Sequence, residues 1–187
     1  LGVRPNSELV AQAGIPLGVQ DAIRVNERME TGVEGVWAAG DCVESYHLVA
    51  RQPAYIALGT VANKQGRVAG INIAGGYATF PGVLGTAITK FCGVGVARTG
   101  LQTIEIEALG LQYATARIDS TARAHYYPDP GRITVKVFAE KGSGRLLGGQ
   151  IVATGDNSSA YLAAKRIDIL ATALQAGMRV DDMLNLD

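Results

Sequence analysis

The sequence contains little cysteine and no excess of charge of either sign. Its two cysteines, Cys42 and Cys92, form no Cys-x-x-Cys pair and no metal-ligand spacing. A protein with only two cysteines, which form neither of these patterns, is typical of a reducing compartment. We therefore expect a cytoplasmic location. The 17 basic and 17 acidic residues cancel. The chain therefore lacks the basic field that binds a phosphate backbone, and nucleic acid is not an expected partner.

Long apolar runs are absent as well. No stretch approaches the roughly 18 consecutive apolar residues that a membrane-spanning helix needs, so no membrane partner is expected. The first residues include Arg4 and Glu8 and lack the apolar segment of a signal peptide. The chain begins at Leu1, within what reads as a continuing fold, and we expect it to be a piece of a longer protein.

Glycine, in contrast, is abundant. The 187 residues include 24 glycines spread along the chain without a fixed period, which excludes a collagen-like repeat. A composition that is 48% hydrophobic and 18% charged is typical of a globular protein. Many glycines in such a protein indicate tight turns and close backbone approaches, as in nucleotide-binding α/β proteins.

The pattern of apolar residues divides the chain into two parts. Residues 1–78 read as an incomplete α/β domain, with a buried parallel strand at 36–39 and a helix at 57–74. Residues 79–187 read as an α+β domain, with an antiparallel sheet and helices on one side.

Periodicity predicts the elements of the second part. Apolar residues alternate with polar or mixed neighbours over 133–139, which is the pattern of a half-buried antiparallel strand. A helix is predicted over 157–176, with Asn157 or Ser158 as its N-cap and Gly177 at its end. The expected strands are 87–91, 94–98, 112–118, 133–139 and 146–152.

The end of the predicted strand at 36–39 carries the first candidate binding residues. Gly40 would let a ligand approach the backbone closely. Asp41 follows at the carboxyl end of the strand, where open α/β sheets bind ligands, and its carboxylate could accept hydrogen bonds from sugar hydroxyls. The alternative interpretation is an aspartate that only caps a turn, and the spacing alone does not choose between the two.

The start of the predicted helix at 57–74 is the second candidate. A helix that begins near Gly59 exposes free N–H groups and a partial positive charge, which favour an electron-rich ligand. Asn63 lies one turn further on, followed by Lys64 and Arg67. These three polar residues could equally form a solvated helix face.

Both stretches resemble one enzyme family. Residues 31–41 resemble the second flavin-binding fingerprint of the pyridine nucleotide–disulfide oxidoreductases. Residues 58–67 resemble the same helix in one branch of this family, which contains coenzyme A-disulfide reductases, NADH oxidases and NADH peroxidases. The resemblance implies that FAD binds here, with Asp41 on a ribityl hydroxyl and the helix start on the flavin ring. It also implies that Asn63 reaches the substrate. The cofactor-binding residues implied by the resemblance are Thr31, Gly40, Asp41, Leu58, Gly59 and Thr60.

Motifs of the second part resemble the C-terminal dimerisation domain of the same branch, in order and spacing. They include Leu84–Phe91, Leu147–Gln150 and Lys165–Asp168. The resemblance implies a homodimer in which a tyrosine, Tyr126 or Tyr127, reaches into the partner's active site and donates a hydrogen bond to a leaving thiolate. Two aromatic residues before a proline could instead be packing anchors, and the resemblance does not say which of the two would act.

Several parts of a complete enzyme of this family are missing from the sequence. No Gly-x-Gly-x-x-Gly follows a strand, so neither dinucleotide phosphate fingerprint is present. The family's redox cysteine is also missing, and Cys42 is interpreted as structural. His47 and His125 have no partner at metal-ligand spacing, so no metal is expected. This chain alone is therefore not expected to transfer hydride.

The resemblance implies a parent enzyme that uses FAD and NAD(P)H. That enzyme would reduce a low-molecular-weight disulfide, coenzyme A disulfide or a persulfide, through flavin and a single redox cysteine outside this chain. One alternative is an NADH oxidase that passes the electrons to dioxygen. A second alternative is that the chain acts only as a non-enzymatic dimerisation module.

Overall fold

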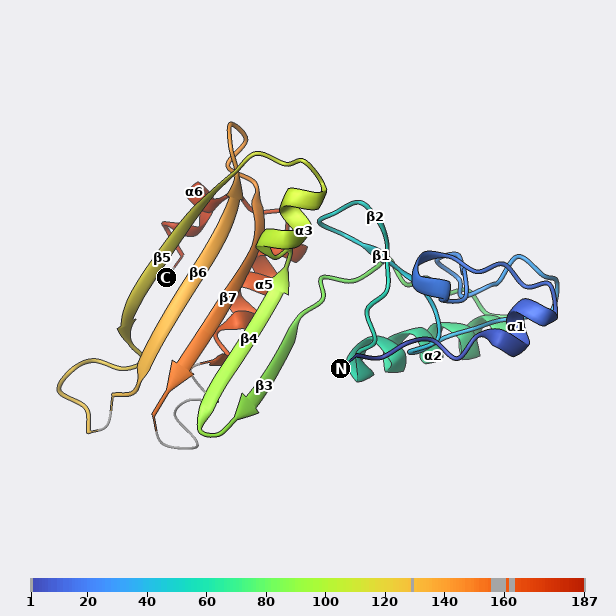
Figure 1. Ribbon diagram of the computed structural model, residues 1–187, viewed down its shortest axis with the longest axis horizontal. Helices are drawn as coiled ribbons and strands as arrows, with labels where there is room; N and C mark the ends of the chain where they lie inside the picture. The colour runs from blue at the N-terminus through green and yellow to red at the C-terminus, as the bar shows by residue number, and fades with distance from the viewer. Residues whose placement is uncertain (1, 129, 156–160, 162–163, 187) are drawn as a thin grey trace. The chain divides into compact units, whose positions relative to one another are not determined.

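The computed structural model describes residues 2–128, 130–155, 161 and 164–186. The chain forms two compact units, Leu1–Val83 and Leu84–Asp187 (Figure 1). The sequence analysis puts the change of domain between residues 78 and 79. The first unit extends to Val83 because this residue exchanges backbone hydrogen bonds with the strand segment at Tyr46 and Leu48 (Leu48 N to Val83 O 2.9 Å, Val83 N to Tyr46 O 2.8 Å).

The first unit consists of short elements packed on one long helix. These elements are α1 (Glu8–Gln12), the 3₁₀ turn η1 (Val19–Asp21), the antiparallel pair β1 (Ser45–His47) and β2 (Gln52–Ala54), and the helix α2 (Gly59–Ile73). Helix α2 confirms the predicted helix. It buries Val68 and Ala69 against Met29, and Trp37 and Phe80 pack around this cluster.

The prediction of a buried strand at 36–39 is wrong, because these residues form no regular strand in this structure. Only Trp37 forms a bridge, with Glu30, and the bridge is antiparallel. Residues 36–39 are half-buried. A parallel strand needs a neighbour on each side to satisfy its N–H and C=O groups. No described segment lies beside this one as a parallel strand, so it is an extended segment without a ladder.

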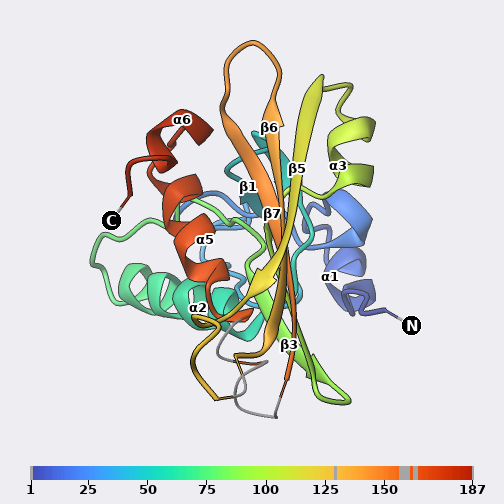
Figure 2. The same cartoon turned by 90° about the vertical axis from the view of Figure 1, so that its left-hand side faces the viewer.

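The second unit is a five-stranded antiparallel sheet with the order β3-β4-β7-β6-β5. Its five strands confirm the predicted ones, with β4 to β7 longer than expected. Figure 2 views the sheet nearly edge-on, with α5 (Ile167–Gln175) against one face, as expected for the α+β fold. Ile133, Ile151 and Ala153 of the sheet pack there against Ile167 and Leu170 of α5. The strands are β3 (Ala87–Phe91), β4 (Val94–Gly100), β5 (Tyr113–Thr121), β6 (Arg132–Glu140) and β7 (Leu146–Thr154).

The helices of this unit differ in detail from the sequence prediction. The short α3 (Thr103–Ala108), which the sequence analysis did not predict, lies at the opposite face from α5 (Figure 2). The end of the predicted helix over 157–176 forms α5, and a turn at Lys165–Arg166 separates α5 from the helical residue Ala164. The N-cap predicted at Asn157 or Ser158 lies outside the described residues. Helix α6 (Val180–Met183) follows.

The C-terminal end of α5 forms a Schellman motif, as the predicted glycine at its end implies. Gly177 has φ +68°. Its N–H donates to the Leu174 carbonyl (3.1 Å), and the Met178 N–H donates to the Ala173 carbonyl (2.9 Å). Two carbonyls at the end of the helix, which have no partner within it, are therefore satisfied. This motif requires Gly177 to adopt a left-handed conformation.

We therefore expect Gly177→Ala to destabilise the second unit. A Cβ disfavours the left-handed conformation by about 1 kcal/mol, and the free energy of unfolding should fall by that amount in a urea titration followed by circular dichroism. Gln175→Ala is the matched control, since Gln175 is an exposed helical residue at the same end of α5. An equal loss in both variants would contradict this explanation.

Candidate cofactor site

The candidate site is centred on the corner formed by Gly40 and Asp41. Gly40 has φ +93°, a backbone conformation that favours glycine. A Cβ built on Gly40 would lie 3.6 Å from the Cβ of Ala62, so the corner rests on the first turns of α2. The structure thus brings the predicted acidic corner next to the start of the predicted helix.

A buried glutamine of α2 holds this corner. Gln65 is 0% exposed. Its Oε1 accepts the Gly40 N–H (2.9 Å), and its Nε2 donates to Ser45 Oγ of β1 (2.9 Å). One amide therefore ties the corner, the helix and β1 together. The sequence analysis missed Gln65. Its position three and four residues before Val68 and Ala69, on the apolar face of α2, is the signal that could have found it.

Asp41 is exposed, and its backbone is held by a tyrosine. The Tyr55 hydroxyl donates to the Asp41 backbone carbonyl (2.8 Å). Burial raises the pKa of Tyr55, and the neighbouring Asp41 raises it further. In the described part of the chain, the Asp41 carboxylate itself has no hydrogen bond or ion pair, so it can accept hydrogen bonds from a ligand. Cys42 is half-buried, and its Sγ lies 3.6 Å from the Ala39 carbonyl oxygen.

The start of α2 supplies backbone donors beside this corner. Leu58 is the N-cap, with extended dihedral angles (φ −139°, ψ 131°), and its carbonyl accepts the N–H groups of Val61 and Ala62. Gly59 and Thr60 are exposed, and their N–H groups precede the first hydrogen bonds of the helix. These N–H groups and the positive end of the helix dipole favour an electron-rich ligand.

Thr31 and Asn63 have different surroundings. Thr31 is buried, and its hydroxyl donates to the Val36 carbonyl (3.1 Å) and accepts the Val33 N–H (3.4 Å). The side chain thus closes the turn at 31–36, and direct contact with a cofactor stays a prediction. Asn63 is exposed on α2, so it can meet a substrate, which also stays a prediction.

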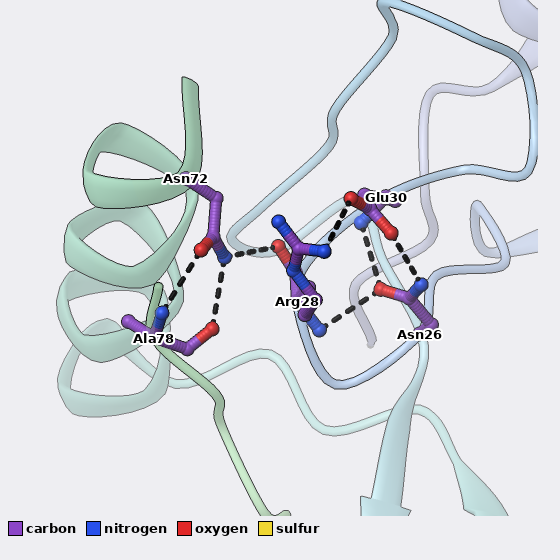
Figure 3. Close-up of polar contacts among 5 residues, drawn as sticks. All are labelled: Asn26, Arg28, Glu30, Asn72 and Ala78. Atoms are coloured by element: carbon purple, nitrogen blue, oxygen red, sulfur yellow. Dashed lines mark hydrogen bonds and ion pairs between the residues drawn. The ribbon is translucent and has the colours of Figure 1, made fainter. Parts of the chain in front are cut away.

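The turn that leads into the fingerprint is fastened to the other end of α2 (Figure 3). Asn26 Oδ1 accepts the N–H groups of Arg28 and Glu30, and Arg28 forms an ion pair with Glu30 (3.5 Å). Asn72, which is 5% exposed, donates from Nδ2 to the carbonyls of Arg28 and Ala78 and accepts the Ala78 N–H. One buried side chain therefore joins α2 to the turn at Arg28 and to the segment at Ala78.

We expect Asn72→Ala to destabilise the first unit by about 2–3 kcal/mol, since it leaves three backbone groups without their partner. The only tryptophan of the chain, Trp37, lies in this unit, so fluorescence during chemical unfolding reports the change. Lys64→Ala, an exposed substitution on the same helix, is the control and should change the stability by less than about 0.5 kcal/mol.

The two candidate tyrosines lie in the second unit. Tyr126 is 85% exposed and Tyr127 is 51% exposed, and their ring centroids lie 5.2 Å apart. Neither ring is buried in the core of this unit. Their action in a partner's active site stays a prediction.

The structure adds two observations on other kinds of site. Among the residues that it describes, no group of three or more His, Cys, Asp or Glu side chains is placed to hold a metal ion. Within the same residues, no helix is both long and apolar enough to cross a membrane.

Comparison with known protein families assigns both units. A glycine–acid corner on a helix, followed by an antiparallel α+β domain, defines a nucleotide-binding segment joined to a second domain. Residues 1–72 match the family described as pyridine nucleotide-disulphide oxidoreductase, and residues 86–186 match its dimerisation domain. The chain therefore belongs to the pyridine nucleotide-disulfide oxidoreductase family, as the resemblance of its motifs implies.

Relatives with assigned activities match along the whole chain. The chain is 41% identical over 186 residues to an NAD(P)H coenzyme A polysulfide/persulfide reductase of Pyrococcus horikoshii. It is 34% identical to an NADH oxidase of Methanocaldococcus jannaschii and 27% identical to a coenzyme A disulfide reductase of Staphylococcus epidermidis. All of the chain is covered in each case, and it spans about 40% of the length of these relatives.

A solved structure has the same fold. A NAD-dependent persulfide reductase from A. fulgidus superimposes with a TM-score of 0.92 at 47% sequence identity, over 100% of this chain and 33% of that chain. The pairing of a pyridine nucleotide-disulfide oxidoreductase segment with an antiparallel dimerisation domain is thus the fold of this chain.

Proposed function

We propose that this chain is the C-terminal part of an FAD-dependent NAD(P)H oxidoreductase. The observation that carries the proposal is the Gly40–Asp41 corner, which is held by Gln65 and lies against the first turns of α2. An exposed carboxylate suits the hydroxyls of a ribityl chain, since it accepts hydrogen bonds and carries no donor. It would repel a phosphate, so the donor set fits the ribityl part of FAD.

The residues at the start of α2 would hold the flavin ring. The N–H groups of Gly59 and Thr60 and the helix dipole would face its pyrimidine edge, where negative charge builds up on reduction. When bound, FAD would accept hydride from NAD(P)H and deliver electrons to a redox cysteine outside this chain. Leu58, as the N-cap, fixes the direction in which these N–H groups point.

We further propose a low-molecular-weight disulfide as the substrate, either coenzyme A disulfide or a persulfide. The names of the Pyrococcus and Staphylococcus relatives support this substrate class. Each turnover would consume one NAD(P)H and one proton. Coenzyme A disulfide would give two thiols, and a persulfide would give one thiol and hydrogen sulfide. Asn63 would contact the substrate, and Tyr126 or Tyr127 would donate a proton or hydrogen bond to the leaving thiolate.

An NADH oxidase is the second candidate, favoured by the similarity to the Methanocaldococcus enzyme. In that case the electrons would pass to dioxygen, and neither Asn63 nor the tyrosines would be needed for a thiol substrate. Oxygen consumption with NADH alone, compared with NADH oxidation under nitrogen in the presence of coenzyme A disulfide, would distinguish the two. The cytoplasmic location and the choice between NADH and NADPH stay predictions.

The flavin proposal is tested on the product of the complete open reading frame that encodes this chain. We expect the purified protein to be yellow, with the visible absorbance of bound FAD. Asp41→Asn should weaken FAD binding by about 10- to 100-fold, because hydrogen bonds to a charged acceptor contribute about 1.5–3 kcal/mol.

The control for this experiment is Asp21→Asn, another exposed aspartate of the same unit, and it should leave the FAD dissociation constant unchanged. A colourless wild-type protein that binds no added FAD would overturn the proposed function. It would leave the alternative of a non-enzymatic dimerisation module.

We propose that the second unit mediates a homodimer, which the description of its family as a dimerisation domain supports. Size-exclusion chromatography with light scattering of the 187-residue chain should give about twice the mass of one chain. A monomer at every concentration tested would contradict dimerisation through this chain alone and would leave the flavin proposal unaffected.

A further inference from the structure

Tyr55 connects the two elements of the proposed flavin site. It lies in the extended stretch between β2, which ends at Ala54, and α2, which begins at Gly59. Its backbone is therefore three residues before the N-cap, Leu58. Its hydroxyl, at the far end of the side chain, donates to the Asp41 carbonyl (2.8 Å). One residue thus bridges the acidic corner and the start of the helix.

The hydrogen bond of Tyr55 complements that of Gln65. Gln65 accepts the N–H of Gly40 on one side of the corner, and Tyr55 donates to the C=O of Asp41 on the other. A glycine with φ +93° has few steric limits of its own. Two hydrogen bonds, one at each end of the Gly40–Asp41 dipeptide, remove the rotational freedom that would otherwise reorient the Asp41 side chain.

The ionisation of Tyr55 supports this role. Burial and the neighbouring Asp41 raise the pKa of the Tyr55 hydroxyl, which moves its deprotonation still further above neutral pH, where a tyrosine is already protonated. A protonated phenol can donate to a carbonyl, whereas a phenolate cannot. The bond to Asp41 is therefore present under the conditions in which an enzyme of this class works.

We propose that Tyr55 is a positioning residue for the cofactor, which sets the direction of the Asp41 carboxylate relative to the start of α2. The inference rests on the proposed function, because it assigns Tyr55 a role only through Asp41 and the flavin. The effect of Tyr55 should appear in FAD binding, beyond the small loss of stability that the removal of one neutral hydrogen bond causes.

The test uses Tyr55→Phe in the complete protein, with the FAD dissociation constant measured by fluorescence quenching. We expect FAD to bind about 3- to 10-fold more weakly, the effect of losing one neutral hydrogen bond. The melting temperature of the FAD-free protein should fall by no more than a few degrees, the effect of losing one neutral hydrogen bond. Tyr46→Phe is the matched control, because Tyr46 is a half-exposed tyrosine of β1 in the same unit. This control should bind FAD like the wild type.

A double-mutant cycle shows whether Tyr55 acts through Asp41. If it does, Tyr55→Phe combined with Asp41→Asn should bind FAD no more weakly than Asp41→Asn alone. Fully additive losses, or wild-type FAD affinity in Tyr55→Phe, would each overturn the inference.

These outcomes differ from the failure of the proposed function. If the wild-type protein binds no FAD, the proposed function and the role of Tyr55 both fall. If the wild type binds FAD and Asp41→Asn weakens it, but the cycle is additive, only the role of Tyr55 is wrong.

Discussion

The buried amide of Gln65 is the interaction on which the first unit depends. A side chain that is 0% exposed must satisfy its polar atoms inside the protein. Gln65 does so with the backbone of Gly40 and the hydroxyl of Ser45. Since an amide offers both a donor and an acceptor, it can join a loop and a strand to the helix at the same point. An apolar residue at this position would pack but would leave the corner without its hydrogen bond.

Asn72 likewise joins neighbouring segments to α2, at the other end of the helix. Together, the two amides attach the turn before the fingerprint, at Arg28, and the end of the fingerprint, at Gly40, to one rigid helix. This arrangement explains how a stretch without regular secondary structure keeps a defined conformation. Residues 36–39 have no ladder of hydrogen bonds among the described residues, and in this chain Gln65 of α2 and Tyr55 hold the backbone of Gly40 and Asp41.

The second unit is built by a different principle. Its sheet is continuous from β3 to β5, and its core forms where the apolar face of the sheet meets α5. Every strand was predicted because period-two alternation is a local property of a half-buried strand. Helix α3 was not predicted, because six residues are too short to show a helical period. The break before α5 was missed because apolar residues lie on both sides of Lys165–Arg166, and no proline or glycine marks a break there.

The sequence by itself determined the family, the two-part organisation, the helix at α2 and the candidate residues Gly40 and Asp41. These features depend on residue type and spacing along the chain, which a sequence displays directly. Only the tertiary structure decided that residues 36–39 form no strand here, and that Gln65 and Tyr55 hold the corner. Both results depend on which segments lie side by side in space. Gln65 and Gly40 are 25 residues apart in sequence, and Tyr55 and Asp41 are 14 apart, so no local pattern could pair them.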